Sequence, residues 1–212
     1  VALDFAAKGY NAFVLRYSVA EHARYPAPLF DAFRAIMMLR ENAARWHIDP
    51  ARVAVIGFSA GGHLAAATAV LWNDPAVQAQ LGISGGINRP DAAILGYPVI
   101  TSGEFAHRGS FDNLIGPDPS AETLEFVSLE KQAGPHTPPV FIWHTADDPG
   151  VPVENALLLA CALRKAGVPF ELHIYQSGPH GLSLCTEETG MVSKSCEGWL
   201  ELAAGWLSER FA

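Results

Sequence analysis

The chain has 212 residues, of which 50% are hydrophobic and 17% charged, and 22 acidic against 14 basic residues give a formal net charge of −8. This composition is typical of one folded domain and excludes a disordered chain. The chain has no basic tract and no apolar run near the ~18 residues of a membrane span, so we expect no nucleic-acid partner and no membrane partner.

The predicted elements alternate between helices and strands. In chain order we expect a helix over 1–8, a strand over 12–17, a helix over 29–46, a strand over 52–57, a helix over 61–71, strands over 92–97 and 140–144, a helix over 153–166, a strand over 170–175 and a helix over 193–209. Strands separated by helices are typical of right-handed βαβ units. The sequence therefore predicts an α/β fold, with a mostly parallel sheet sandwiched by helices, in a single domain over 1–212.

The stretch 99–138 lies between two predicted strands and is rich in Gly, Pro and Ser, with scattered aromatic residues. We expect it to be irregular. Ligands of open α/β sheets bind at the carboxyl ends of the strands, so we expect this excursion to lie over that face.

Residues Gly57-Phe58-Ser59-Ala60-Gly61-Gly62 follow a buried strand directly and open a helix. G-x-S-x-G in this context is typical of a nucleophile elbow, a sharp turn that lifts a serine hydroxyl above the sheet. The first amides of the helix then point at the reacting centre. Ser59 is the candidate nucleophile, and the backbone N–H of Ala60 is the candidate oxyanion donor. The alternative, a phosphate-binding turn, would want the Lys of a P-loop, which is missing.

A serine hydroxyl needs a base to take its proton and a carboxylate to orient that base. On this fold the partners follow in the order serine, acid, histidine, each after a later strand. His180, in a glycine-flanked loop after the last predicted strand, is the candidate base. Asp147 and Asp148 both follow the strand over 140–144 and are both candidates for the acid, and the spacing to Val151-Pro152 favours Asp148. The alternative for the pair is a charge cluster at a helix N-terminus.

The remaining histidines and the cysteines predict no metal site, because no pair has HExxH or CxxC spacing. His63, one helical turn after Ser59, is expected to support the elbow, and His144 to be packed or hydrogen-bonded at a strand end. Cys161, Cys185 and Cys196 are expected to be free thiols, with a Cys185–Cys196 bridge as the alternative.

Four motifs occur in order: Gly-Phe-Ser-Ala-Gly-Gly-His at 57–63, Tyr-Pro-Val-Ile at 97–100, Phe-Ile-Trp-His-Thr-Ala-Asp-Asp at 141–148 and Gly-Pro-His-Gly at 178–181. Through them the chain resembles the α/β-hydrolase superfamily, and within it a branch of small acetyl esterases and xylan esterases. The resemblance implies Ser59 as nucleophile, His180 as general base and then acid, and Asp148 as the residue that fixes the imidazole. It also implies short-chain acyl esters as substrates, often acetyl groups on sugars, and no cofactor.

The sequence departs from this family at its beginning. Members carry a glycine-rich loop upstream of the first helix that donates an oxyanion-hole amide, whereas this sequence opens at Val1 in a predicted helix. We therefore expect this loop and the first strands to be missing, Ala60 to be the sole oxyanion donor, and activity to be lowered. The strand over 12–17 would then be an exposed sheet edge, which predicts a homo-oligomer paired through that edge.

The expected function is that of a serine esterase that hydrolyses short-chain acyl esters, acetyl esters of sugars or xylan among them, through an acyl-enzyme. A weakly active or silent hydrolase-fold fragment and a serine peptidase of the same fold are the alternatives. A long-chain lipase is disfavoured because 99–138 is not a large apolar lid. No signal peptide is visible, so a soluble, cytoplasmic protein is favoured while the location stays open.

Overall fold

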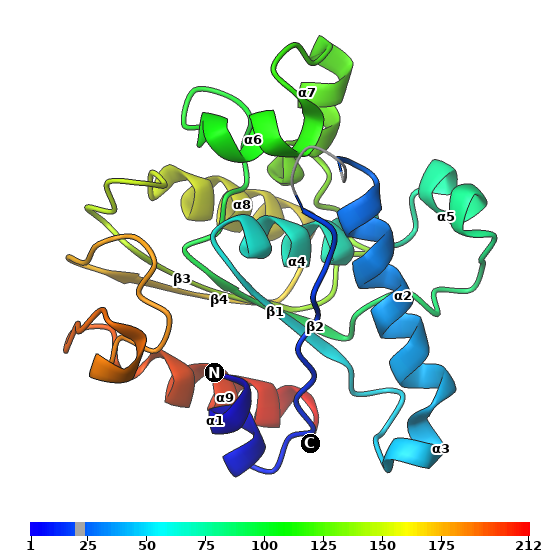
Figure 1. The fold of residues 1–212 in the computed structure, drawn as a ribbon, viewed down its shortest axis with the longest axis horizontal. Helices are drawn as coiled ribbons and strands as arrows, with labels where there is room; N and C mark the ends of the chain where they lie inside the picture. Colours follow the sequence, from blue (N-terminus) through cyan, green and yellow to red (C-terminus); the bar gives the residue numbers. More distant parts are fainter. Residues whose placement is uncertain (20–23) are drawn as a thin grey trace.

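A computed structural model of the chain describes residues 1–19 and 24–212. Over these residues four parallel strands form one sheet in the order β1-β2-β3-β4: β1 (Ala54–Phe58), β2 (Ala92–Gly96), β3 (Val140–Thr145) and β4 (Phe170–Tyr175). The helices are α1 (Ala2–Ala7), α2 (Ala27–Glu41), α3 (Ala43–Trp46), α4 (Ala60–Leu71), α5 (Pro75–Leu81), α6 (Arg108–Ile115), α7 (Ala121–Val127), α8 (Glu154–Ala166) and α9 (Trp199–Arg210), with short 3₁₀ helices η1 (Leu129–Lys131) and η2 (Glu187–Thr189) (Figure 1).

Helices cover both faces of the sheet, α1 and α9 on one and α2, α4 and α8 on the other (Figure 1). Successive side chains of a strand point to opposite faces. In β2, Leu95 therefore packs in the core with α4 and α8, while Ile94 packs with α9. Both faces of the sheet are buried, which explains why the central strands β2 and β3 read as continuous apolar runs. The predicted α/β fold, a parallel sheet between helical layers, is confirmed.

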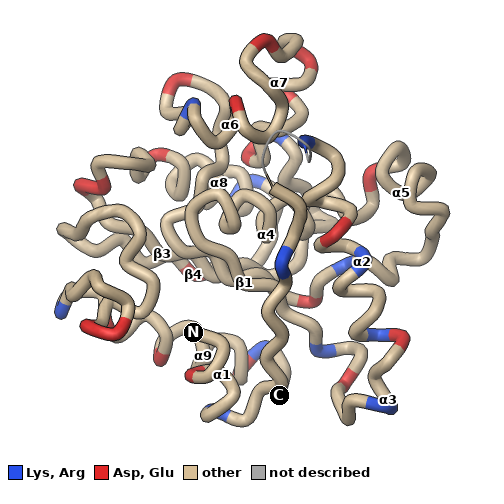
Figure 2. The backbone as a smooth tube through the Cα atoms, in the orientation of Figure 1, with Lys and Arg blue, Asp and Glu red and all other residues tan. Residues whose placement is uncertain are grey.

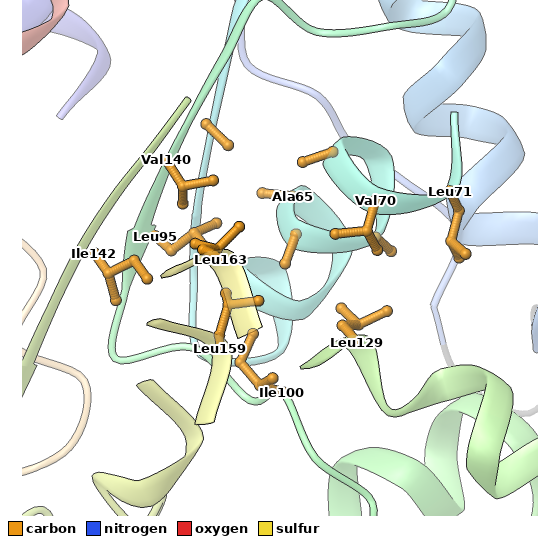
Figure 3. Close-up of a cluster of buried hydrophobic side chains, with 14 of the residues drawn as sticks. Ala65, Val70, Leu71, Leu95, Ile100, Leu129, Val140, Ile142, Leu159 and Leu163 are labelled. Atoms are coloured by element: carbon orange, nitrogen blue, oxygen red, sulfur yellow. The ribbon is translucent and has the colours of Figure 1, made fainter. Parts of the chain in front are cut away.

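The larger core lies between the sheet and α4. Small and branched side chains of α4 share this core with strand and α8 residues, and Figure 3 shows Val70, Leu95, Ile142 and Leu159 among the side chains of this layer. Helix α4 carries no Lys, Arg, Asp or Glu, and Figure 2 shows the charged residues gathered on the surrounding helices and loops. Burial of α4 fixes the helix that follows Ser59, so the core sets where the elbow stands.

The structure corrects the prediction of a strand over 12–17. No strand is assigned to residues 10–19, because none of the strands in the described part of the chain pairs with them, and a strand needs a hydrogen-bonded neighbour. Phe13 and Val14 are exposed there instead. The edge of the sheet on this side is β1, whose Ile56 is 39% exposed.

Other boundaries also move. The stretch 99–138 is not irregular throughout, since it contains α6, α7 and η1. Its Val99, Phe111 and Val127 form a small apolar cluster with Val151, just after the predicted acid. The expected helix over 29–46 is two helices, α2 and α3, and the last helix begins at Trp199. No helix of the described residues is long and apolar enough to cross a membrane.

Candidate active site

Ser59 stands on a sharp turn between β1 and α4. Its backbone has φ 54° and ψ −121°, a left-handed conformation that a residue with a side chain rarely adopts. The neighbouring glycines make the turn sterically accessible. A Cβ on Gly57 would lie 2.0 Å from the carbonyl oxygen of Gly61, and one on Gly62 would lie 2.8 Å from Cβ of Pro98. The Ser59 amide donates to the Gly96 carbonyl at 3.0 Å, which ties the turn to the carboxyl end of β2.

The structure brings Ser59, His180 and Asp148 together. Oγ of Ser59 lies 2.7 Å from Nε2 of His180, and Nδ1 of His180 lies 2.7 Å from Oδ2 of Asp148. The three residues come from segments 121 and 32 residues apart in sequence. The imidazole therefore hydrogen-bonds the hydroxyl on one side and the carboxylate on the other. Such a chain can take a proton from the serine and stabilise the imidazolium that forms.

Asp148 is held as a carboxylate. Its Oδ1 accepts the amides of Gly150 at 2.8 Å and Val151 at 3.0 Å, and its side chain is 1% exposed. Burial acts to raise its pKa, but hydrogen bonds from His144, His180 and the two amides outweigh burial and hold the pKa well below its usual range. Asp148 is thus ionised at neutral pH, which is the state that its predicted role as orienting acid requires.

Asp147 contacts the histidine loop rather than the imidazole. Its carboxylate accepts the Ser177 hydroxyl at 2.7 Å and the Gly178 amide at 2.8 Å, and these bonds, that from Ser177 first, lower its pKa. The Thr145 hydroxyl donates to the Gly178 carbonyl at 2.8 Å. Asp147 and Thr145 therefore fasten the loop that carries His180 to the loop that carries Asp148.

Two further residues pack against the imidazole that the sequence did not single out. The Tyr97 ring meets the His180 ring edge-on at 5.0 Å, and its hydroxyl accepts the Ser183 amide at 2.9 Å. Burial raises the pKa of Tyr97 to about 12, so it stays a neutral phenol. A Cβ on Gly150 would lie 3.0 Å from Cγ of His180. Tyr97 lies in the Tyr-Pro-Val-Ile motif, and that motif was the signal for it.

His63 lies away from the serine hydroxyl. Its Nε2–H donates to the Val127 carbonyl at 2.9 Å, and its ring meets Phe111 edge-on at 5.5 Å. Burial lowers its pKa to about 4. His63 thus ties α4 to the excursion between β2 and β3, one turn beyond the elbow that it was expected to support.

An apolar cavity of about 370 Å³ opens beside the elbow. It lies among α2, α4, α6 and α7, and its lining includes Tyr17, Leu29, Ala60, Leu64, Phe111 and Leu129. The Ala60 amide is the first of α4, and such first-turn amides have no partner within their helix. Ala60, the residue after Ser59, is part of the cavity lining.

The cysteines are free thiols, as expected, with Cys161 exposed and Cys185 and Cys196 buried. Burial, acting together with Cys196, raises the pKa of Cys185 to about 12. In the described part of the chain no three His, Cys, Asp or Glu residues gather as a metal site would require.

Comparison with known proteins identifies relatives of the chain. The family model BD-FAE matches residues 1–163. The chain is 42% identical over 192 residues to endo-1,4-beta-xylanase B of Butyrivibrio fibrisolvens, covering 88% of this chain and 30% of that protein. It is 32% identical over 184 residues to an acetylxylan esterase of Xylanibacter ruminicola, covering 84% of this chain and 36% of that protein. The chain thus spans about a third of the length of these relatives.

Solved structures agree with this grouping. An acetyl ester-xyloside bifunctional hydrolase from Caldicellulosiruptor lactoaceticus superposes with a TM-score of 0.87 at 40% identity, covering 98% of this chain and 74% of that one. The resemblance to acetyl and xylan esterases drawn from the four motifs is confirmed. The chain belongs to the BD-FAE family and has the α/β-hydrolase fold.

Proposed function

We propose that the chain is a serine esterase that hydrolyses short-chain acyl esters through Ser59, His180 and Asp148. The observation that carries this proposal is the unbroken hydrogen-bonded run from Oγ of Ser59 through both nitrogens of His180 to Oδ2 of Asp148, with 2.7 Å at each step. Residues in such a run act as nucleophile, base and orienting acid.

The reaction has two halves. Nε2 of His180 takes the proton of Oγ of Ser59 as Oγ bonds to the ester carbonyl carbon. His180 then gives that proton to the alcohol oxygen as its bond to the carbonyl carbon breaks, which leaves an acyl-enzyme. Water then attacks the acyl carbon while Nε2 of His180 takes a proton from it. His180 returns that proton to Oγ of Ser59 as the bond between Oγ and the acyl carbon breaks and the acid leaves. Asp148 holds Nδ1–H throughout, so that the lone pair of Nε2 faces the hydroxyl.

The negative charge that forms on the ester carbonyl oxygen is stabilised, in this proposal, by a hydrogen bond from the backbone N–H of Ala60. One such donor is worth about 10²–10³ in turnover.

The proposed substrates are acetyl esters of sugars or of xylan. The names of the relatives support this class, since they include an acetylxylan esterase, a xylanase and an acetyl ester-xyloside hydrolase. We place the acyl group toward the apolar cavity beside Ala60. The cavity is larger than an acetyl group needs, so a series of acetyl, butyryl and octanoyl esters beside acetylated xylan measures the chain length it accepts.

The decisive experiment compares the chain with Ser59→Ala on p-nitrophenyl acetate. Turnover by the chain and its loss in the variant are expected, together with covalent labelling of Ser59 by a fluorophosphonate. Equal rates in both proteins would refute the assignment. Labelling without turnover of any ester would identify a silent hydrolase fold.

We further propose that copies of the chain pair through the exposed edge of β1. Unpaired N–H and C=O groups at a sheet edge favour pairing with another strand. Size-exclusion chromatography with light scattering should report a dimer or larger species, and a monomer at high concentration would contradict the proposal.

A further inference from the structure

His144 is a second histidine beside the carboxylate of Asp148. It lies near the end of β3, and its side chain is fully buried. Its Nε2 is 3.0 Å from the Val151 carbonyl oxygen and 3.4 Å from Oδ2 of Asp148. Oδ2 therefore has an imidazole on each side, His180 at 2.7 Å and His144 at 3.4 Å.

The contacts of His144 determine which nitrogen carries the proton. Both neighbours of Nε2 are acceptors, a carbonyl and a carboxylate, so Nε2 is the donor. Nδ1 is buried and has no hydrogen-bond partner among the described residues. A buried polar atom without a partner lowers stability, and an apolar side chain at this position would only exchange that loss for an unpartnered Val151 carbonyl, so the imidazole brings no clear gain in packing. An imidazole here is thus better explained by the carboxylate it faces than by packing.

We infer that His144 is a positioning residue that fixes the carboxylate of Asp148 in the orientation His180 needs, an inference that rests on the proposed esterase function. Two backbone amides hold Oδ1 of Asp148, and the Nε2–H of His144 lies against the other oxygen. Val151 completes the arrangement, because its amide donates to Oδ1 while its carbonyl accepts from His144. Rotation of the carboxylate would break contacts on both sides.

The test uses a matched pair of substitutions. His144→Leu removes the donor at similar volume. It exchanges one unpartnered atom, Nδ1, for another, the Val151 carbonyl, so its melting temperature should stay close to that of the parent. His144→Gln keeps an N–H at the end of the side chain. On p-nitrophenyl acetate we expect His144→Leu to lower kcat about tenfold with KM unchanged, and His144→Gln to recover most of that loss.

A double-mutant cycle separates positioning from a general structural role. In an Asp148→Asn background, His144→Leu should cost less than about twofold in kcat, because the carboxylate on which it acts is gone. A loss of the same factor in both backgrounds would overturn the inference, as would an unchanged kcat in the single variant or a His144→Gln enzyme as slow as His144→Leu.

A readout without turnover keeps this test distinct from that of the esterase function. The Nδ1–H of His180, bonded to Asp148, should give a downfield proton NMR resonance. We expect it to be retained in His144→Gln and broadened or shifted in His144→Leu. An unaltered resonance in His144→Leu would overturn the inference even if the chain is an active esterase. If the chain had no Ser59-dependent turnover, the proposed function would be refuted. The NMR resonance of His180 would then still test whether His144 positions Asp148.

Discussion

We predict that the same substitution, Asp to Asn, has very different effects on kcat at the neighbouring residues Asp147 and Asp148. In Asp148→Asn, the side-chain oxygen can still accept the amides of Gly150 and Val151, which leaves an NH₂ group facing Nδ1 of His180. Two donors cannot share that bond, so the imidazole turns to the other tautomer and presents N–H to Ser59. A histidine in that form cannot take the serine proton.

The expected loss for Asp148→Asn is about 10⁴-fold in kcat, about 5 kcal/mol in activation free energy. Asp147→Asn is the matched control. Its oxygen can accept the Gly178 amide and its NH₂ can donate to the Ser177 hydroxyl, so the clasp between the loops survives. We expect a loss of only a few-fold there.

Both variants are assayed as kcat and KM on p-nitrophenyl acetate, with near-ultraviolet circular dichroism to verify the fold. If kcat fell about 10⁴-fold in Asp147→Asn and less than tenfold in Asp148→Asn, the roles of the two carboxylates would be reversed. If both variants fell equally, the tautomer argument would be wrong.

Three further predictions concern stability. Because Ser59 has a positive φ, Ser59→Gly should be more stable than Ser59→Ala by about 1 kcal/mol in urea unfolding, although both are inactive; equal stabilities would show that the turn is unstrained. Gly57→Ala places a Cβ 2.0 Å from a backbone oxygen and should cost about 3 kcal/mol or more, whereas Gly205→Ala, in open space on α9, should be neutral or stabilising by up to about 1 kcal/mol; similar values for the two would contradict the steric reading. Burial lowers the pKa of His63 from 6.5 to about 4, so between these two pH values the unfolded chain binds a proton at His63 that the folded chain does not bind. The free energy of unfolding should therefore fall by about 3 kcal/mol as the pH drops from 6.5 to about 4. His63→Gln, which keeps a donor for the Val127 carbonyl, should flatten that part of the unfolding-versus-pH curve, and an unchanged curve would count against it.

The sequence was most informative where chemistry depends on local order. The elbow at 57–62 is a strand, a turn and a helix in succession, so its glycines could be read without knowledge of distant residues. His180 and Asp148 followed because chain order fixes which strand end each occupies, and parallel strands bring those ends to one edge. The choice between Asp147 and Asp148 was the limit of this reasoning, because adjacent side chains differ only in direction.

Features that depend on distant partners were not predictable. The run over 12–17 has strand composition, but pairing is decided by neighbours, and no strand pairs with it in the described part of the chain. Helix α7 was missed although Ser120 caps it, its hydroxyl accepting the Thr123 amide at 3.1 Å. Glycine and proline around it concealed that signal. His144 was predicted to be packed or hydrogen-bonded, but its partner Asp148 was not, because their proximity exists only in the folded chain.

The clasp from Asp147 and Thr145 to residues 177 and 178 has a consequence for motion. It joins the two loops by three hydrogen bonds. We therefore expect Asp148 and His180, which these loops carry, to move together. Ser59 stands on another segment, the turn between β1 and α4. We therefore expect the distance between Oγ of Ser59 and Nε2 of His180 to vary more than the distance between Nδ1 of His180 and Oδ2 of Asp148.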